Sequence, residues 1–369
     1  MTDRDIFVTQ PFLPPLSEFT PYLEQIWHNR VLTNGGPFHE QFEAALCEYL
    51  GVDHISVFAN GTLALMTALQ ALDSSGEIIT TPFSFVATSN SILWNRLDPV
   101  FVDIDPITFN LDPRNIKAAI TPRTSAILAV HCYGHPCDVE GIESVAAANG
   151  LRVIYDAAHA FGVRDAGGSV LRHGDLSVLS FHATKVFNTF EGGAIISASL
   201  EMKTRIDQLK NFGHMGESTV VAAGINGKMS EFGAALGLLQ LTHVDDAIAR
   251  RGAIDRQYRG GLAGVPGISC LGPSTEDHAN YAYFPIIVTD DYVLSRDELI
   301  ERLRARGVFP RKYFSPLISD FPMYRQLPSA DPGGLPIARS AADRVLCLPI
   351  YPDLDSSDVE RIVQIVSEA

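Results

Sequence analysis

Short apolar runs alternate with helical patterns through the first two-thirds of the chain, and this alternation constrains the fold more than any other feature. Short buried strands separated by helices are typical of α/β layering. We therefore predict an α/β fold with a large domain built on a mainly parallel central sheet. The runs are HISVF (54–58), EIIT (77–80), SAILAVH (125–131), RVIYD (152–156), LSVLSF (176–181) and GAIISAS (193–199).

A second, smaller domain is expected beyond this sheet. Residues 232–262 are predicted to form one long helix whose polar second half leaves the first domain. The apolar run YFPIIVT (283–289) and a terminal helix from Ser356 then indicate a small α/β unit. We expect a large domain over residues 1–245 and a small C-terminal domain over residues 246–369.

Composition excludes several classes of partner. The chain has 28 Lys and Arg against 43 Asp and Glu, a net charge of −15, and no basic cluster, so a nucleic-acid partner is not expected. With no run of about 18 apolar residues and no signal-peptide pattern, we expect a cytoplasmic protein without a membrane partner. Reduced thiols are expected, because the five cysteines are few, odd in number and scattered.

The helix that follows the strand over 54–58 carries a candidate phosphate site. Residues 61–72 predict a helix with one apolar face. Asn60, Gly61 and Thr62 lie at its N-terminus, where free N–H groups and the helix dipole favour a phosphate. A small phosphorylated ligand is therefore compatible with the acidic composition.

Two side chains that follow other predicted strands could act on such a ligand. Lys185 follows the run 176–181 among small and apolar residues, where burial lowers an ammonium pKa and favours the neutral, nucleophilic amine. Asp156 ends the run 152–156 at the edge where open α/β sheets bind ligands, and a carboxylate there could pair with the pyridine nitrogen of pyridoxal phosphate (PLP). Singly, each has a simpler interpretation: a lysine extending into solvent, or a helix N-cap. The combination of Lys185, Asp156 and the helix start is more specific for a PLP site than any one of them alone.

A set of longer motifs extends this pattern over most of the chain, in order: NGGPFHEQFE (34–43), NGTLAL (60–65), TPFSFVATSNSI (81–92), HCYGHPCD (131–138), DAAHAFG (156–162), SFHATK (180–185), EGGA (191–194) and GINGKMSEFGAALG (224–237). In these motifs and their spacing the chain resembles the DegT-type (DegT/DnrJ/StrS) sugar aminotransferases. That resemblance implies a PLP-dependent enzyme of the aspartate-aminotransferase fold, also called fold type I.

The resemblance implies roles for the residues already named. Lys185 matches the lysine that binds PLP as a Schiff base and moves the substrate proton, with pyridoxamine phosphate as the intermediate cofactor form. Asp156 matches the partner of the pyridine nitrogen. Gly61 and Thr62, with Ser180, match the group that binds the cofactor phosphate.

Four more candidates come from the resemblance alone. Phe85 matches the aromatic residue that stacks on the cofactor ring, and His159 stands where many members have glutamine near the ring's 3-hydroxyl. Asn226 resembles the asparagine that reaches the phosphate from a neighbouring subunit, which implies a homodimer with shared active sites. Tyr313 is a candidate for contact with the sugar, with core packing as the alternative.

The resemblance also implies the reaction. An amino group would move from L-glutamate to C4 of a nucleotide-linked 4-keto-6-deoxy sugar, with dTDP-4-keto-6-deoxy-D-glucose as the best match and dTDP-4-amino-4,6-dideoxy-D-glucose as the product. A 3-keto sugar or a GDP-linked, perosamine-type sugar remains an alternative, since a few loop substitutions could redirect the substrate.

Other functions are less compatible with these residues. Related sugar dehydratases have histidine at the position of Lys185, and a non-catalytic regulator would not need Lys185 together with Asp156. The segment 131–138 contains histidine and cysteine, but its spacing is not that of a zinc site, so no metal is expected.

Overall fold

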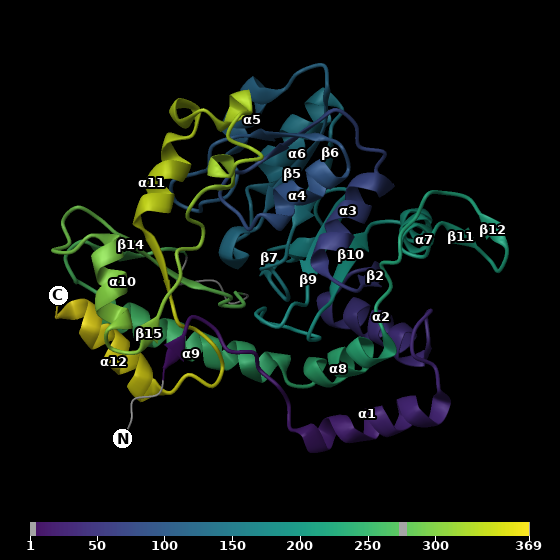
Figure 1. Ribbon diagram of the computed structural model, residues 1–369, viewed down its shortest axis with the longest axis horizontal. Coiled ribbons are helices and arrows are strands. Elements are labelled where there is room, and N and C mark those ends of the chain that lie inside the picture. Colours follow the sequence, from purple (N-terminus) through teal and green to yellow (C-terminus); the bar gives the residue numbers. More distant parts are fainter. Residues whose placement is uncertain (1–4, 273–278, 369) are drawn as a thin grey trace.

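The computed structural model of the protein describes residues 5–272 and 279–368. A seven-stranded sheet covered by helices forms its centre, and a smaller unit lies beside it (Figure 1). The strand order is β2 (His54–Phe58), β10 (Gly193–Ser197), β9 (Leu176–Ser180), β6 (Arg152–Asp156), β5 (Thr124–Val130), β3 (Glu77–Thr80) and β4 (Asp98–Phe101). Neighbouring strands are parallel except that β10 is antiparallel to both β2 and β9. The predicted α/β fold with a mainly parallel sheet is confirmed.

Strand β4 is one element that the apolar pattern did not indicate. It is four residues long, reads DPVF and lies at the edge of the sheet next to β3. Pro99 has no N–H to donate, and proline in a strand is tolerated mainly at such an edge. A short strand with a proline and a charged first residue therefore carries little sequence signal.

Helices cover both faces of the central sheet because successive strand residues point to opposite sides. Ile78 packs in a core with α3 and α7, whereas Ile79 packs in a core with α5 and α6. The second face also carries α2 and α8 over strands β2, β9 and β10. The helices of this part are α1 (Leu16–Asn29), α2 (Pro37–Leu50), α3 (Gly61–Ala71), α4 (Ala87–Trp94), α5 (Pro113–Ala119), α6 (Val139–Asn149), α7 (Leu200–Leu209) and α8 (Glu231–Leu241).

The C-terminal residues form a second core around an antiparallel sheet of three strands. Its elements are β13 (Ile268–Cys270), β14 (Phe284–Val288) and β16 (Val345–Leu348), with α9 (Val244–Leu262), α10 (Arg296–Arg304), α11 (Pro336–Arg344) and α12 (Ser356–Ser367). The predicted strand over 283–289 and the helix from Ser356 are both present. The expected smaller C-terminal α/β unit is thus confirmed.

The N-terminal segment packs with this second core. Strand β1 (Ile6–Phe7) pairs in parallel with β15 (Val308–Phe309), and Ile6 is buried among the side chains of α9, α10 and α12. The exact division into domains 1–245 and 246–369 stays a prediction, because α9 crosses it and the first residues return to the C-terminal side.

The long helix expected over 232–262 is in fact two helices, α8 and α9, separated by Thr242 and His243. The Thr242 hydroxyl and N–H both donate to the Leu239 carbonyl (2.7 and 3.1 Å), so this carbonyl of the last turn of α8 has partners at the helix end. Asp245 and Asp246 then lie in the first turn of α9, where carboxylates stabilise a helix N-terminus. The two helices run one after the other beneath the sheet (Figure 1).

Several of the predicted site residues lie at one end of the central sheet, where parallel strands such as β6 finish. Gly193, at the start of antiparallel β10, pairs with Phe58 at the end of β2 and with Ser180 at the end of β9. Asp156 ends the parallel strand β6 at the same end of the sheet. Ligands bind at the carboxyl ends of strands in open α/β sheets, so the fold brings the predicted residues to a suitable place.

Candidate active site

The N-terminus of α3 forms an anion-binding cradle. The Asn60 side chain caps the helix by accepting from the Leu63 N–H (2.9 Å), while the N–H groups of Gly61 and Thr62 have no acceptor among the described residues. A Cβ atom on Gly61 would lie 3.0 Å from the Ser180 Cβ. A Cβ atom on Gly193 would lie 2.7 Å from the Gly61 nitrogen. Glycine at both positions therefore lets the helix end approach β9 and β10 closely.

Asp156 is held by hydrogen bonds to both of its oxygens. The Thr88 hydroxyl donates to Oδ2 (2.8 Å), and the Ala158 N–H donates to Oδ1 (3.1 Å). Burial raises the pKa of Asp156, whereas these two hydrogen bonds and the positive charge of Lys185 act in the opposite direction. The described residues that directly follow Asp156, 157–163, form no helix, so the N-cap interpretation of this residue is wrong.

The ring of His159 has one defined tautomer. Its Nδ1 accepts from the Tyr133 N–H (3.2 Å), so the proton of the neutral ring must lie on Nε2. Burial lowers the pKa of His159 well below its usual value, and nearby Lys185 lowers it further. The ring lies parallel to Phe314 (4° between planes) and edge-on to Tyr283 (4.7 Å between centroids). His159 is therefore a neutral hydrogen-bond donor at Nε2.

Lys185 lies in the loop between β9 and β10, where its N–H donates to the His182 carbonyl (2.9 Å). Burial lowers the pKa of its ammonium to about 8, although the negative charge of Asp156 raises it. Most molecules still carry the ammonium near neutral pH, but the neutral, nucleophilic amine is more abundant than for an ordinary lysine.

A single cavity of about 870 Å³ gathers most of the predicted site residues. It opens between the sheet edge and the loop that follows β15. The predicted residues that line it are Gly61, Thr62, Phe85, Asp156, His159, Ser180, Lys185 and Tyr313.

Asn226 is the predicted site residue that does not line this cavity. It is exposed, and its backbone pairs with Asn211 beyond α7. The nearby hairpin of β11 (His214–Met215) and β12 (Thr219–Val220) projects from the body of the molecule (Figure 1).

Several residues of the site were missed by sequence reasoning. The Ser84 and Thr88 hydroxyls are 2.9 Å apart, and because an ionised Asp156 accepts the Thr88 proton, Ser84 must donate to Thr88. Tyr283 and Phe314 enclose His159 from the C-terminal unit. The motif over 81–92 contained Ser84 and Thr88, but nothing in it indicated a contact with Asp156.

In residues 5–272 and 279–368, no three histidine, cysteine or acidic side chains converge to hold a metal ion. Within the same ranges, no helix is both long and apolar enough to cross a bilayer.

The comparisons with known proteins agree with this geometry. The family model described as "DegT/DnrJ/EryC1/StrS aminotransferase family" matches residues 16–367. The chain belongs to this family. It is therefore an enzyme of the aminotransferase type, as the motifs predicted.

Individual relatives of this aminotransferase are similar over their whole length. The chain is 56% identical over 366 residues to a protein of Shigella dysenteriae named "dTDP-4-amino-4,6-dideoxy-D-glucose transaminase", and 56% identical over 367 residues to a protein of the same name from Escherichia coli. In both cases 99% of each chain is covered. A crystal structure of DesI in the presence of its TDP-sugar product superposes with a TM-score of 0.94 at 36% identity, covering 99% of this chain and 93% of that one.

The residues present fit PLP, the cofactor that this aminotransferase family implies. The cradle at Gly61 and Thr62 offers unpaired N–H groups of the kind a phosphate needs. The carboxylate of Asp156 lines the same cavity and is fixed by its two hydrogen bonds, and Lys185 supplies an amine with a lowered pKa. These residues would hold the phosphate, the ring nitrogen and the reactive carbon of the cofactor, respectively.

Proposed function

We propose that this enzyme moves an amino group from L-glutamate to C4 of dTDP-4-keto-6-deoxy-D-glucose and releases dTDP-4-amino-4,6-dideoxy-D-glucose. The observation that carries the proposal is the presence of Lys185, Asp156 and the α3 cradle in one cavity of a chain that is 56% identical, end to end, to relatives named for this product. PLP is the cofactor. The five free cysteines are compatible with a reducing cytoplasm, where we place the reaction.

When bound, PLP supplies an electrophilic carbon that accepts the amino group and a ring that withdraws electrons from the substrate carbon. Asp156 would hold a negative charge beside the ring nitrogen and so favour its protonated form. His159 would donate from Nε2 to the ring's 3-oxygen, and Phe85 would cover the ring. These side chains bind and orient the cofactor; none of them carries the substrate proton.

Lys185 carries the proton. In the first half of the reaction its neutral Nζ removes the proton from the α-carbon of glutamate. In the second half the ammonium delivers a proton to C4 of the sugar. Because Lys185 would deliver the proton to one face of C4, a single configuration forms; by similarity to the relatives named for this product, we propose the gluco configuration with an equatorial amine.

We further propose that the active unit is a homodimer in which Asn226 completes the phosphate site of the partner subunit. Two observations support this proposal. Asn226 is exposed and does not line the cavity of its own chain, and the surface residues near it in the sequence are unusually apolar. Exposed side chains of this segment are Phe212, Met215, Val220 and Val221.

The substrate is tested by comparing kcat/KM for three nucleotide-linked ketones with glutamate as donor: dTDP-4-keto-6-deoxyglucose, its 3-keto isomer and the GDP-linked 4-keto sugar. We expect a preference of about tenfold or more for the first, and NMR of the product should show an equatorial C4 amine. Lys185→Ala is the control without turnover. A tenfold preference for either other ketone would overturn the assignment of the substrate.

A further inference from the structure

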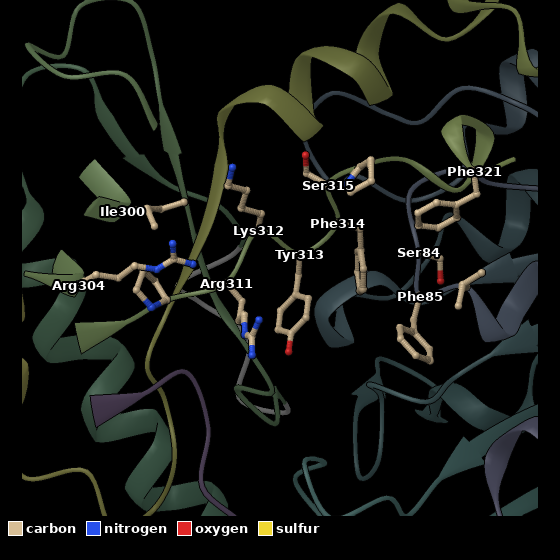
Figure 2. Close-up of a pocket in the computed structure, with 13 residues that line it drawn as sticks. Ser84, Phe85, Ile300, Arg304, Arg311, Lys312, Tyr313, Phe314, Ser315 and Phe321 are labelled. Atoms are coloured by element: carbon tan, nitrogen blue, oxygen red, sulfur yellow. The ribbon is translucent and has the colours of Figure 1, made fainter. Parts of the chain in front are cut away.

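A second cavity of about 330 Å³ adjoins the first one. It lies between the loop after β3 in the large domain and the segment from Pro310 to Pro316 in the C-terminal unit (Figure 2). Four residues line both cavities: Ser84, Phe85, Tyr313 and Phe314. A ligand bound in the first cavity can therefore extend directly into the second one.

The charge of this second cavity is opposite to that of the molecule. The protein carries a net charge of −15, yet the described residues that line the cavity include three cations and no carboxylate. Lys312 Nζ is paired with Asp297 (2.7 Å), and Arg304 is paired with Glu301 (2.8 Å). Arg311 has no hydrogen-bonding or ion-pair partner for its guanidinium in the described part of the chain. One full positive charge is thus available to a ligand.

Arg311 is also well placed to act on a ligand. Its backbone exchanges two hydrogen bonds with Cys347 in β16 (2.8 and 3.2 Å), so the base of the side chain is fixed while the guanidinium is free. Figure 2 shows the Arg311 guanidinium, the Tyr313 hydroxyl and the Phe85 ring directed toward the same side, whereas Lys312 points the other way. The positive charge of Arg311 acts to lower the pKa of the Tyr313 phenol against the effect of burial, as expected for close neighbours.

We propose that Arg311, with the Tyr313 hydroxyl beside it, binds the diphosphate of the nucleotide-linked substrate. This inference rests on the proposed function and assigns one part of the substrate to the second cavity. A guanidinium offers a planar pair of donors that matches phosphate oxygens, and a phenol can donate one more hydrogen bond. The flat base of the nucleotide can then pack on the aromatic rings of the cavity.

The chemistry of the two substrates favours the diphosphate over a donor carboxylate. In the sugar, the diphosphate is attached to C1, across the ring from the C4 ketone, so it must point away from Lys185 when C4 lies at the amine. The α-carboxylate of the amino donor is attached to the reacting carbon itself and must stay within the first cavity. Arg311 lines the second cavity and is absent from the lining of the first.

The test uses the holoenzyme and thymidine diphosphate as the probe. Binding of thymidine diphosphate and of thymidine is measured by calorimetry for wild type, Arg311→Gln and Arg311→Lys. We expect the thymidine diphosphate Kd to rise about tenfold or more in Arg311→Gln and by less in Arg311→Lys, which keeps the charge but loses the planar fork. The thymidine Kd should change less than about twofold, because it carries no phosphate.

The two half-reactions separate the sources of the anion. In Arg311→Gln, the KM of the keto sugar should rise in parallel with the Kd of thymidine diphosphate, while the spectral change with glutamate alone should keep its wild-type concentration dependence. Arg344→Gln removes the same charge from a residue paired with Asp290 and is the matched control. Arg311→Lys keeps the test open if Arg311→Gln does not fold.

Two results would overturn the proposal. A weakened glutamate half-reaction with unchanged thymidine diphosphate binding would assign Arg311 to the donor carboxylate, and unchanged behaviour in both would leave Arg311 without a role in binding. Neither result touches the proposed function, which fails if wild-type enzyme does not turn over dTDP-4-keto-6-deoxyglucose or prefers another of the ketones about tenfold.

Discussion

At the scale of single residues, the protonation of Lys185 depends on two opposing influences. Burial lowers the pKa of its ammonium to about 8, and the charge of Asp156 limits how far it falls. Only the neutral amine attacks an aldehyde carbon, so the fraction of reactive Lys185 rises as the pH passes through this value. The same balance can be measured in the apoprotein, before any substrate is present.

We predict that covalent incorporation of PLP into the apoprotein accelerates with pH, with a midpoint near the pKa of about 8 for Lys185. In Asp156→Asn the midpoint should move to lower pH, because the negative charge that raises the lysine pKa has gone. Stopped-flow absorbance at a series of pH values measures both midpoints. Borohydride reduction and peptide mapping identify the labelled lysine, and label on another lysine would contradict the assignment.

Thr88 is a positioning residue for Asp156 in this structure. Thr88→Val removes the hydroxyl with little change in shape, and a lost hydrogen bond to a charged group costs about 1.5–3 kcal/mol. We expect kcat to fall by at least about tenfold with a smaller change in KM, since the charge at the ring nitrogen acts in the transition state. Thr88→Ser keeps the hydroxyl and should restore most of the rate. An effect on melting temperature alone, with kcat unchanged, would make Thr88 purely structural.

At the scale of elements, the close approach of α3 to strands β9 and β10 defines the phosphate cradle. A Cβ atom on Gly193 would lie 2.7–2.8 Å from backbone atoms of Asn60 and Gly61, and backbone cannot move aside as a flexible side chain can. The cradle therefore depends on glycine at this register position of β10.

We predict that Gly193→Ala destabilises the protein by about 1–3 kcal/mol and weakens PLP binding, because the added methyl group pushes the α3 N-terminus away from β10. Gly260→Ala is the matched control: it lies within α9 with nothing within 4 Å of its Cβ, so it should stabilise the helix by up to about 1 kcal/mol. Urea unfolding and titration of apoprotein with PLP give the two quantities. Wild-type affinity for PLP in Gly193→Ala would show that the cradle tolerates displacement.

At the scale of the whole molecule, Lys185 and Asp156 come from one chain, whereas Asn226 lies outside the cavity of its own chain. A shared site in a homodimer makes a quantitative prediction for mixed subunits. In a heterodimer of Lys185→Ala and Asn226→Asp subunits, one site carries both lesions and the other carries neither.

We therefore expect random mixtures of these two inactive variants to recover about one quarter of wild-type activity, since about half of the dimers are mixed and each has one intact site. A mixture of Lys185→Ala with Asp156→Asn should recover none. Lys185 and Asp156 belong to the same chain's site, so each site of the mixed dimer still carries one lesion. Activity is measured after verified subunit exchange. If the first mixture stays inactive, Asn226 does not act across the interface.

The sequence was sufficient for the parts of this protein that depend on local pattern. Apolar periodicity predicted the strands β2, β3, β5, β6, β9 and β10, because a buried strand must be apolar along its whole length. It failed for β4, whose proline is acceptable only because the strand lies at an edge, and for the break between α8 and α9, where apolar and polar residues continue without interruption. Motifs also predicted Lys185, Asp156 and Gly61 as site residues, because each of them stands at or shortly after the end of a predicted strand.

Only the tertiary structure decided how these groups are protonated and what surrounds them. The tautomer of His159 depends on the Tyr133 N–H, 26 residues away, and the orientation of Asp156 depends on Thr88, 68 residues away. Which of the three cations is free depends on ion pairs with carboxylates of α10, which Lys312 and Arg304 form and Arg311 does not. Burial, hydrogen bonding and charge pairing act between neighbours in space, so the sequence named the chemical groups while the fold determined their protonation, orientation and partners.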